Sequence, residues 1–436
     1  MTRDKPDASK RQASDASLDP SVQADWPPVG GGLERYRIDP TWRFETLAVH
    51  AGFEPDAETG AVAPPIYQTS TYAQEGVGRP RNGWEYARTD NPTRSRLEAA
   101  VAALEGGRVG VAFASGSATT HAIASLARAG EEVVVSDDVY GGTYRLFERV
   151  LKDLGVQARY VDLTGDPAAA LADAVGPKTR LVWVESPSNP LLKLIDLKAT
   201  AAALTGRSGA RDERPLLVVD NTFASPVLQR PLMLGADIVY HSSTKYLAGH
   251  SDTVNGVAVT SRQEVAEQLA FLQNALGAVP GPFDCFLVLR GLRTLPLRVE
   301  RHANNALVVA HALAERSDIA VLRYPGLIAG AHAHPQAKLA ARQMAYPGGM
   351  VSFVPRERGG RSPSERARRF CEATRLFVLA ESLGGVESLC EVPAAMTHGS
   401  VQGSPLEVPA ALVRLSVGIE HSDDLVADVT QALDRA

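Results

Sequence analysis

The 436-residue sequence predicts an α/β protein, with a mainly parallel seven-stranded sheet domain followed by a smaller α+β C-terminal domain. From residue 107 onward, short runs of β-branched residues alternate with segments of helical length. The runs are apolar along their whole length, as expected for a parallel sheet that is covered on both faces. Beyond residue 295 the pattern changes to long Ala/Arg/Leu segments with isolated strands, which indicates a second domain.

Seven apolar runs predict the strands of the large sheet. Each has a length typical of a buried strand and is followed by turn-forming residues or by a helical pattern. The connections between them are therefore expected to be right-handed crossovers. The runs are VGVAFA (109–114), EEVVVS (131–136), ARYVDL (158–163), RLVWVES (180–186), PLLVVDN (215–221), ADIVYHS (236–242) and GVAVTS (256–261).

The remaining segments complete the predicted organisation. Residues 1–42 are rich in Asp, Ser, Pro and Gly, which predicts a disordered extension, and the turn-rich residues 43–100 predict an arm that contacts a neighbouring subunit. In the C-terminal part, GGMVSFV and LVRLSVGI predict strands. The closing SDDLVADVTQALDRA predicts an amphipathic helix with Ser422 as its N-cap. The domains are expected at residues 101–295 and 296–436.

Composition excludes several classes of function. The formal net charge of −5 argues against a general nucleic-acid binder. No run of about 18 apolar residues and no signal-peptide pattern is present, so we expect neither membrane insertion nor secretion, and a cytoplasmic location. The three cysteines are far apart in the sequence and form no CxxC motif, so we predict neither a disulfide framework nor a metal site.

The segment His241–Tyr246 carries the strongest chemical signal. It follows an apolar strand, and ligands of open α/β sheets bind beyond the carboxyl ends of strands. Lys245 in such a cleft can lose its proton and attack an aldehyde, which an arginine cannot do. Ser242 and Thr244 add hydroxyl groups for a phosphate. A solvent-exposed lysine after a strand is the alternative for Lys245 considered alone.

Two further strand ends support a phosphate-bearing cofactor. The small residues Gly116 and Ser117 open a predicted helix, whose free N–H groups favour an anion, although such a turn requires small residues in any case. Asp220 follows a fully apolar strand, where a protonated ring nitrogen would compensate its charge; a turn aspartate is the alternative. Together with Lys245, these positions indicate pyridoxal 5′-phosphate.

Three more residues fit a site for this cofactor and an amino-acid substrate. Tyr140, followed by two glycines, is a candidate for stacking on a flat ring, with a core tyrosine as the alternative. Arg414 interrupts an apolar strand, which a bidentate contact with a substrate carboxylate explains. Asn189 in ESPSNP is a candidate for orienting the ring hydroxyl or the carboxylate, although SPSNP is also an ordinary turn.

From residue 43 to the end, the sequence resembles the Cys/Met-metabolism enzymes of pyridoxal-phosphate fold type I. This group contains the cystathionine γ-lyases, γ-synthases and β-lyases and the methionine γ-lyases. Many motifs occur in the expected order, which makes a chance resemblance very improbable. They are WEYARTDNPTR, FASGSATT, SDDVYGGT, ESPSNPLLK, VVDNTFASP, HSSTKYLAGHSD, LAESLGGVESL, MTHGS and LVRLSVGIE.

The resemblance implies a role for each of these positions. Lys245 would bind the cofactor covalently and move protons, Asp220 would pair with the ring nitrogen, and Tyr140 would stack on the ring and serve as an acid or base. Tyr86 and Arg88 would reach into the neighbouring subunit's site and hold its phosphate, within a homotetramer of two catalytic dimers. The implied phosphate cup is Gly116, Ser117, Ser242 and Thr244. The implied substrate side is Asn189, Ser382, Arg414, Glu381 and Glu85.

Within the group, the sequence favours cystathionine γ-lyase with a side activity that releases hydrogen sulfide. Gly142 replaces a cysteine typical of the methionine γ-lyases, Glu381 matches the γ-lyases and γ-synthases, and Glu85 with residues 271–295 resembles γ-lyases most. Cystathionine γ-synthase is the main alternative, followed by β-lyase and, remotely, by a non-catalytic binding protein with this fold.

Two departures from the family pattern affect loops near the predicted site. Ala87 and Asp90 stand where the family usually has Ser and Gly, which questions the loop geometry beside Arg88. The stretch between His398 and Arg414 is also a few residues shorter than usual. A loop near the substrate entrance is therefore expected to differ.

Overall fold

A computed structural model describes residues 33–36, 38, 39 and 41–436, so most of the extension predicted at 1–42 lies outside the described residues. Within the last part of that segment, Leu33–Arg35 forms a 3-10 turn. Arg35 Nη1 donates a hydrogen bond to Asp90 Oδ2. The end of the segment therefore contacts the folded part, and the folded chain begins earlier than composition predicts.

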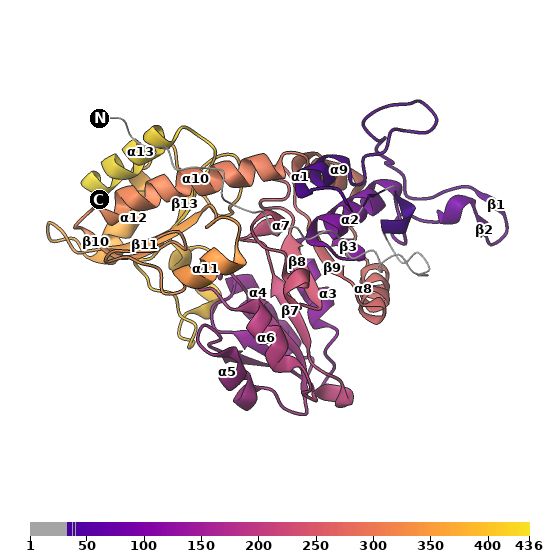
Figure 1. The fold of residues 1–436 in the computed structure, drawn as a ribbon, viewed down its shortest axis with the longest axis horizontal. Coiled ribbons are helices and arrows are strands. Elements are labelled where there is room, and N and C mark those ends of the chain that lie inside the picture. Colours follow the sequence, from indigo (N-terminus) through magenta and orange to yellow (C-terminus); the bar gives the residue numbers. More distant parts are fainter. Residues whose placement is uncertain (1–32, 37, 40) are drawn as a thin grey trace.

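The central sheet has seven strands in the order β3-β9-β8-β7-β6-β4-β5 (Figure 1). β8, β7, β6, β4 and β5 are mutually parallel, while β9 runs antiparallel to both β8 and β3. This confirms the predicted fold class, a mainly parallel sheet of seven strands. The strands are β3 (Val109–Phe113), β4 (Glu132–Ser136), β5 (Gln157–Val161), β6 (Thr179–Glu185), β7 (Leu216–Asp220), β8 (Ile238–Ser242) and β9 (Gly256–Thr260).

Both faces of this sheet are buried, which explains why its strands are apolar throughout. Val133 and Val135 of β4 belong to one apolar cluster, whereas Val134 between them belongs to another. The side chains alternate between the two faces, as the period of two in a strand requires. The helices of this domain are α3 (Gly116–Ala124), α4 (Gly141–Leu146), α5 (Pro167–Ala174), α6 (Leu197–Leu204), α7 (Ser225–Leu228), α8 (Gln263–Leu276) and α9 (Pro282–Leu292).

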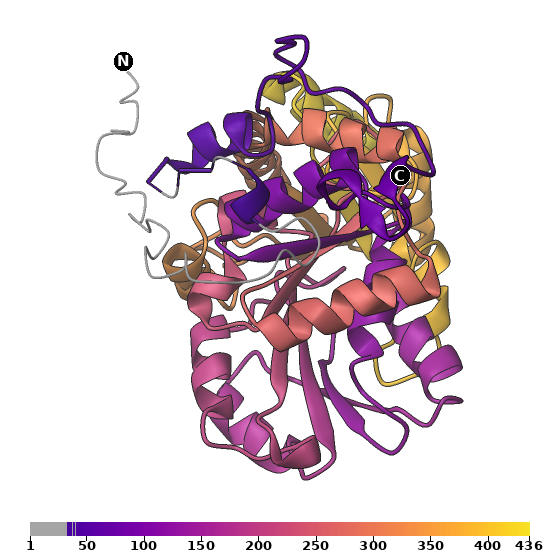
Figure 2. The ribbon, with the colours of Figure 1, turned by 90° about the vertical axis from the view of Figure 1, so that its right-hand side faces the viewer.

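The C-terminal domain contains a second sheet of five strands in the order β10-β11-β14-β13-β12. Its orange and yellow elements lie at the left of Figure 1, and in Figure 2 they lie mostly above and behind the magenta sheet domain. Its strands are β10 (Ile319–Arg323), β11 (Met350–Pro355), β12 (Val378–Leu379), β13 (Leu389–Glu391) and β14 (Val413–Ser416). Its helices are α10 (Leu295–Ala314), α11 (Ala337–Gln343), α12 (Pro363–Ala373) and α13 (Ser422–Arg435).

The N-cap prediction for the last helix is wrong by one residue. His421, not Ser422, caps α13, because the His421 side chain accepts a hydrogen bond from Asp423 N. Ser422 is thus the first helical residue. The preference for Ser at N-caps does not decide the boundary when the preceding residue also carries a ring nitrogen that can accept.

The N-terminal arm projects from the body of the fold at the right of Figure 1. Among the described residues, no helix has both the length and the apolar character needed to cross a membrane. The elements of the arm and of the helix that follows it are α1 (Phe44–His50), β1 (Gln74–Gly76), β2 (Arg79–Pro80) and α2 (Pro92–Glu105).

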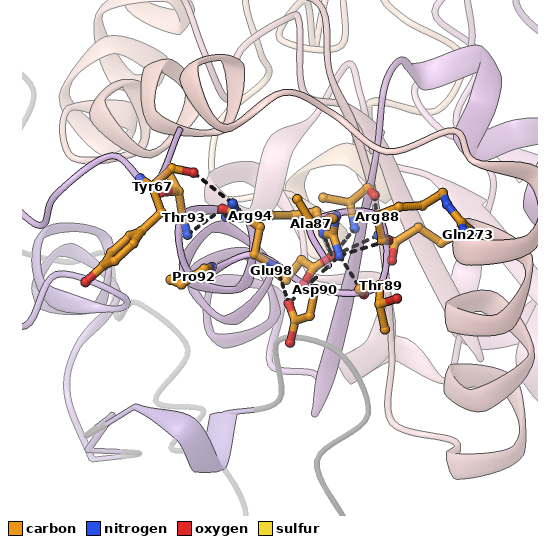
Figure 3. Close-up of polar contacts among 12 residues, drawn as sticks. Tyr67, Ala87, Arg88, Thr89, Asp90, Pro92, Thr93, Arg94, Glu98 and Gln273 are labelled. Carbon is orange, nitrogen blue, oxygen red and sulfur yellow. Dashed lines mark hydrogen bonds and ion pairs between the residues drawn. The ribbon is translucent and has the colours of Figure 1, made fainter. Parts of the chain in front are cut away.

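Arg94 on α2 holds the end of the arm in place (Figure 3). Its guanidinium donates to the carbonyl oxygens of Ala87 at 2.6 Å and Thr89 at 2.8 Å. The same group lies 3.9 Å from Asp90 Oδ1 and 3.6 Å from Glu98 Oε1. Arg94 therefore fixes the loop at residues 87–90, which departs from the family pattern. Asp90 needs no glycine, because its backbone avoids the left-handed region.

We expect Arg94→Met to destabilise the protein by about 3–5 kcal/mol, because it removes a buried cation from its carboxylates and leaves several carbonyls unpaired. Arg96→Met is the matched control on the same helix. Arg96 donates one hydrogen bond, to the Gly52 carbonyl, and we expect that variant to lose only about 1 kcal/mol. Urea denaturation of both variants measures the difference. Equal losses would contradict the special role of Arg94.

Candidate active site

The carboxyl ends of β3, β4, β6, β7 and β8 meet at one edge of the large sheet, and the C-terminal domain contacts this edge. Lys245 follows β8 and is half-buried there. Its Nζ donates a hydrogen bond to Ser382 Oγ of the C-terminal domain at 2.8 Å. Burial, with a contribution from the positive charge of Arg414, lowers the pKa of Lys245 to about 8. The structure thus places Lys245 in a cleft where its amine can be neutral.

This pKa predicts how the rate of cofactor attachment depends on pH. Only the neutral amine attacks an aldehyde, and Lys245 loses its proton near pH 8 rather than 10.5. The rate constant for reconstituting the apoprotein with cofactor should rise about tenfold per pH unit below this pKa and level off above it. Stopped-flow absorbance across this range tests the prediction. A rate that still rises tenfold per unit toward pH 10 would indicate an ordinary lysine.

Two carboxylates lie side by side at the ends of β6 and β7. Asp220 and Glu185 are register partners on adjacent parallel strands, and both are buried. Burial raises the pKa of each carboxyl group, and for Glu185 the neighbouring charge of Asp220 raises it further. Neither group has an ion-pair partner among the described residues. A cation placed here would compensate a charge that is otherwise costly. The sequence analysis missed Glu185, which appeared only as part of ESPSNP.

The predicted phosphate turn lies beside the lysine segment. A Cβ atom on Gly116 would come within 2.7 Å of the Ser242 Cβ, so the close approach of these two segments requires glycine. Gly116 opens α3, whose N-cap Ser115 accepts a hydrogen bond from Ala118 N. Ser117 follows on the first turn and is exposed. Gly116 and Ser242 therefore lie in contact, with the exposed Ser117 next in sequence to Gly116.

Thr244 is bonded to the loop before β9, and its predicted contact with a phosphate stays a prediction. Its hydroxyl donates to the Asn255 carbonyl at 3.1 Å and accepts from Asn255 N at 2.9 Å. These bonds tie Thr244 to the loop before β9. In this state the Thr244 hydroxyl supports the lysine turn.

Tyr140 extends over the same edge from the end of β4. The tyrosine is 38% exposed, and its backbone N–H donates to Glu185 Oε2 at 2.9 Å. A Cβ atom on Gly142 would lie 2.3 Å from the Tyr140 ring, so any larger residue at position 142 would displace the ring. The absence of a cysteine there, noted from the sequence, thus has a direct steric reason in this chain.

The loop after β13 packs against the turn that carries Tyr140. Ser400 Oγ donates to the Gly141 carbonyl at 2.7 Å, and the His398 ring contacts the Tyr140 ring edge-on with a centroid distance of 6.2 Å. The segment 398–400 therefore packs against the turn that carries Tyr140.

Arg414 lies on β14 and is buried. Its Nη1 donates to Asn189 Oδ1 at 2.8 Å, and its Nη2 donates to the Ser382 carbonyl at 2.9 Å. Glu391 on β13, its register partner, lies 3.1 Å away. Arg414 Nε has no hydrogen-bond partner among the described residues. The structure therefore brings Arg414, Asn189 and Ser382 together, and it leaves the guanidinium with an unused donor for a substrate.

Ser382 joins both groups at a strained position. Its φ angle is +104°, which a serine rarely adopts, while its hydroxyl contacts Lys245 and its carbonyl contacts Arg414. The sequence analysis also missed Glu391. Its only signal was an acidic residue within an apolar strand, and its pairing with Arg414 depends on the register of β13 with β14.

Four predicted residues lie outside this group. Arg88 is exposed and donates to the backbone and side-chain oxygens of Asn274 at 2.7 and 2.8 Å. Tyr86, 45% exposed, lies beside Arg88, whose guanidinium is 5.8 Å from the ring centroid. Glu85 and Glu381 are exposed, although the charge of Glu381 favours the protonated form of Lys245.

The assembled residues fit pyridoxal 5′-phosphate. The paired carboxylates suit a ring cation, the start of α3 suits a phosphate, and Lys245 suits the aldehyde. Tyr140, which is 38% exposed beside Glu185, suits stacking on a flat ring. No group of His, Cys, Asp and Glu that would hold a metal ion occurs among the described residues.

Comparison with known proteins gives one consistent result. A cystathionine gamma-synthase of Mycobacterium tuberculosis is 53% identical over 392 residues, covering 89% of this chain and 96% of the relative. A cystathionine gamma-lyase of Dictyostelium discoideum is 46% identical over 397 residues, covering 90% and 98%. Proteins named cystathionine beta-lyase match at 46–48%.

The fold comparison agrees with the sequence comparison. The crystal structure of metB from Corynebacterium glutamicum has a TM-score of 0.85 and 46% identity, covering 91% of this chain and 99% of that one. The family model described as Cys/Met metabolism PLP-dependent enzyme matches residues 45–434. Strand order, site geometry and sequence together lead to one conclusion: the chain belongs to the Cys/Met-metabolism family of pyridoxal-phosphate-dependent enzymes, and its cofactor is pyridoxal 5′-phosphate.

Proposed function

We propose that the chain catalyses chemistry at the Cγ–sulfur bond of cystathionine, with an amino acid as substrate. The observation that carries this proposal is the bridge made by Ser382, which contacts Lys245 through its hydroxyl and Arg414 through its carbonyl. A guanidinium that binds the substrate carboxylate then holds Cα within reach of the Lys245 amine. This arrangement suits a reaction that begins with proton removal at Cα.

Each residue has a separate task in this proposal. Arg414 binds the substrate carboxylate, and Asn189 orients the guanidinium through its side-chain oxygen. Lys245 would take the proton from Cα and then move protons at Cβ. Tyr140 covers the ring and excludes water from one face. The bound cofactor supplies an electron sink for the charge that develops at Cα, and Asp220 stabilises that sink by holding a proton on the ring nitrogen.

Synthesis and cleavage of cystathionine both use these steps. The two reactions differ in the group that enters or leaves at Cγ. The relative at 53% identity supports cystathionine γ-synthase, which joins cysteine to an activated homoserine ester. Cystathionine γ-lyase, the first expectation from Glu85 and residues 271–295, is the second candidate and is supported by the relative at 46%. We propose synthesis as the main reaction, with γ-elimination and hydrogen sulfide release as side activities.

A substrate panel tests the proposal directly. The purified holoenzyme is given an O-acylhomoserine with cysteine, and separately cystathionine alone, while new cystathionine and 2-oxobutanoate are quantified. We expect kcat/KM for synthesis to exceed that for cleavage. A strong excess of 2-oxobutanoate from cystathionine would favour the γ-lyase. Pyruvate as the main product would indicate a β-lyase, and no turnover of either substrate would contradict the proposal.

The arm supports a proposal about assembly. Tyr86 and Arg88 are exposed and make no contact with the residues around Lys245 in the same chain. We propose that they complete the phosphate site of a neighbouring subunit in a homotetramer. Mixing inactive Lys245→Ala and Arg88→Ala subunits tests this, because mixed dimers would regain one intact site. Failure to regain activity after subunit exchange would contradict it.

A further inference from the structure

A buried chain of hydrogen bonds connects the environment of Arg414 to that of Tyr140. Thr397 Oγ1 lies 2.8 Å from Glu391 Oε1 and 2.9 Å from His398 Nδ1. His398 Nε2 lies 3.1 Å from the Asn189 backbone carbonyl. Glu391 and His398 are each 1% exposed, and Thr397 between them is half-buried. The three side chains form one continuous path.

The number of protons in this path determines whether all three contacts can be hydrogen bonds. Three hydrogen bonds need three protons, and a carbonyl can only accept, so His398 Nε2 must carry a proton. Neutral His398 then accepts a hydrogen bond at Nδ1. The Thr397 hydroxyl uses its only proton for that bond. No proton remains for the contact between Thr397 and an ionised Glu391. All three contacts are hydrogen bonds only if the path holds one proton more than neutral His398, the Thr397 hydroxyl and an ionised Glu391 supply.

The surroundings decide where the additional proton resides. Burial, together with the nearby charge of Arg414, lowers the pKa of His398 to about 4, so a charged ring is disfavoured. Burial raises the pKa of Glu391, whereas Arg414 and the Thr397 hydroxyl lower it. Glu391 Oε2 has no hydrogen-bond partner in the described part of the chain, which would be costly for a carboxylate.

The charged and titratable neighbours of the path come from several elements. Arg414 faces both ends of the path, and the backbone carbonyl of Val139 also faces the His398 ring. The titratable neighbours of Glu391 are Arg414, Lys245, Glu381, Cys371 and Cys390.

We propose that Glu391 is a neutral carboxylic acid that donates a hydrogen bond to the Thr397 hydroxyl oxygen. It thereby acts as a positioning residue for Arg414. A neutral Glu391 holds the guanidinium without cancelling its charge. Arg414 then keeps its full charge for the carboxylate of the substrate, whereas an ionised Glu391 would compete with that carboxylate. This inference rests on the proposed role of Arg414 in binding the substrate.

Infrared spectroscopy tests the protonation state without any substrate. The difference spectrum between the wild-type holoenzyme and Glu391→Gln should contain the carbonyl stretch of a protonated carboxyl group, shifted in D₂O. Glutamine imitates the neutral acid, so we expect KM of Glu391→Gln to stay within about threefold of the wild type. Absence of the band, or a KM change of more than about tenfold, would overturn the proposal.

Variants of Thr397 test the path itself. Thr397→Val removes the acceptor, so Glu391 should ionise, its infrared band should vanish and KM should rise about tenfold or more with little change in kcat. Thr397→Ser keeps the hydroxyl and should restore both. In the double variant Glu391→Gln/Thr397→Val no negative charge can form, so KM should return close to the wild-type value.

The double variant separates the proposal from a structural role. If KM of the double variant remains as high as that of Thr397→Val, Thr397 acts only by packing and the proposal is wrong. The infrared result tests only the protonation state of Glu391. Absence of turnover with every substrate would instead contradict the proposed function.

Discussion

Lys245→Ala is expected to lower kcat by at least about 10⁴-fold, because one side chain provides both the covalent anchor of the cofactor and the base at Cα. The half-buried amine lies 2.8 Å from Ser382 Oγ, and no other lysine follows β8 at this edge of the sheet. The variant should also lose the visible absorbance of covalently attached cofactor. Kinetics and absorbance spectra of the purified protein measure both effects.

Lys245→Arg is the matched control, since it keeps the positive charge and nearly the same length. Arginine does not lose its proton in proteins, so we expect this variant to be as inactive as Lys245→Ala. A Lys245→Arg enzyme with substantial turnover would show that charge alone is sufficient. Visible absorbance of attached cofactor that persists in Lys245→Ala would show that another amine holds it.

Asp220→Asn is expected to lower kcat about 30- to 4,000-fold, which corresponds to the 2–5 kcal/mol lost when one partner of a buried charge pair is removed. The reason is that Asp220 is buried beside Glu185 and has no cation among the described side chains until the ring nitrogen binds. The cofactor should also dissociate more readily. Steady-state kinetics and absorbance titration of the apoprotein measure the two effects.

Asp138→Asn provides a control for Asp220. Asp138 is buried at the same sheet edge, and its carboxylate accepts hydrogen bonds from the Ser188 hydroxyl and from Leu191 N, whereas the Asp220 carboxylate accepts one from Thr222 N. We expect this variant to lose stability without a comparable loss of kcat at saturating cofactor. Equal losses of kcat in both variants would mean that Asp220 acts through general packing. A kcat of Asp220→Asn within about threefold of the wild type would also contradict its proposed role.

The large sheet, and the residues at its strand ends, were predictable because they depend on the order of apolar and polar residues within short segments. Seven apolar runs became the seven strands, and polar residues placed after strand ends met at one edge. Lys245, Asp220 and Gly116 follow from this rule, since parallel strands align their carboxyl ends without any knowledge of side-chain packing.

The residues that were missed depend on contacts between distant segments. Glu391 became important only through the register of β13 with β14, and Glu185 through that of β6 with β7. The hydrogen bond from the Thr244 hydroxyl to the Asn255 carbonyl across a loop was likewise not predicted. No local pattern contains such pairings. The N-cap at His421 shows the same limit at the scale of one residue.

The division of the site between two domains has a consequence for how selectivity can be altered. Lys245, Asp220 and Gly116 belong to the large-sheet domain, whereas Ser382 and Arg414 belong to the C-terminal domain. The proposed reactive residues and the proposed carboxylate-binding Arg414 are therefore encoded in separate parts of the gene, while Asn189 contacts Arg414 from the large-sheet domain. A recombinant chimaera that exchanges only the C-terminal part with a relative would transplant substrate choice as a module and leave the reaction chemistry intact.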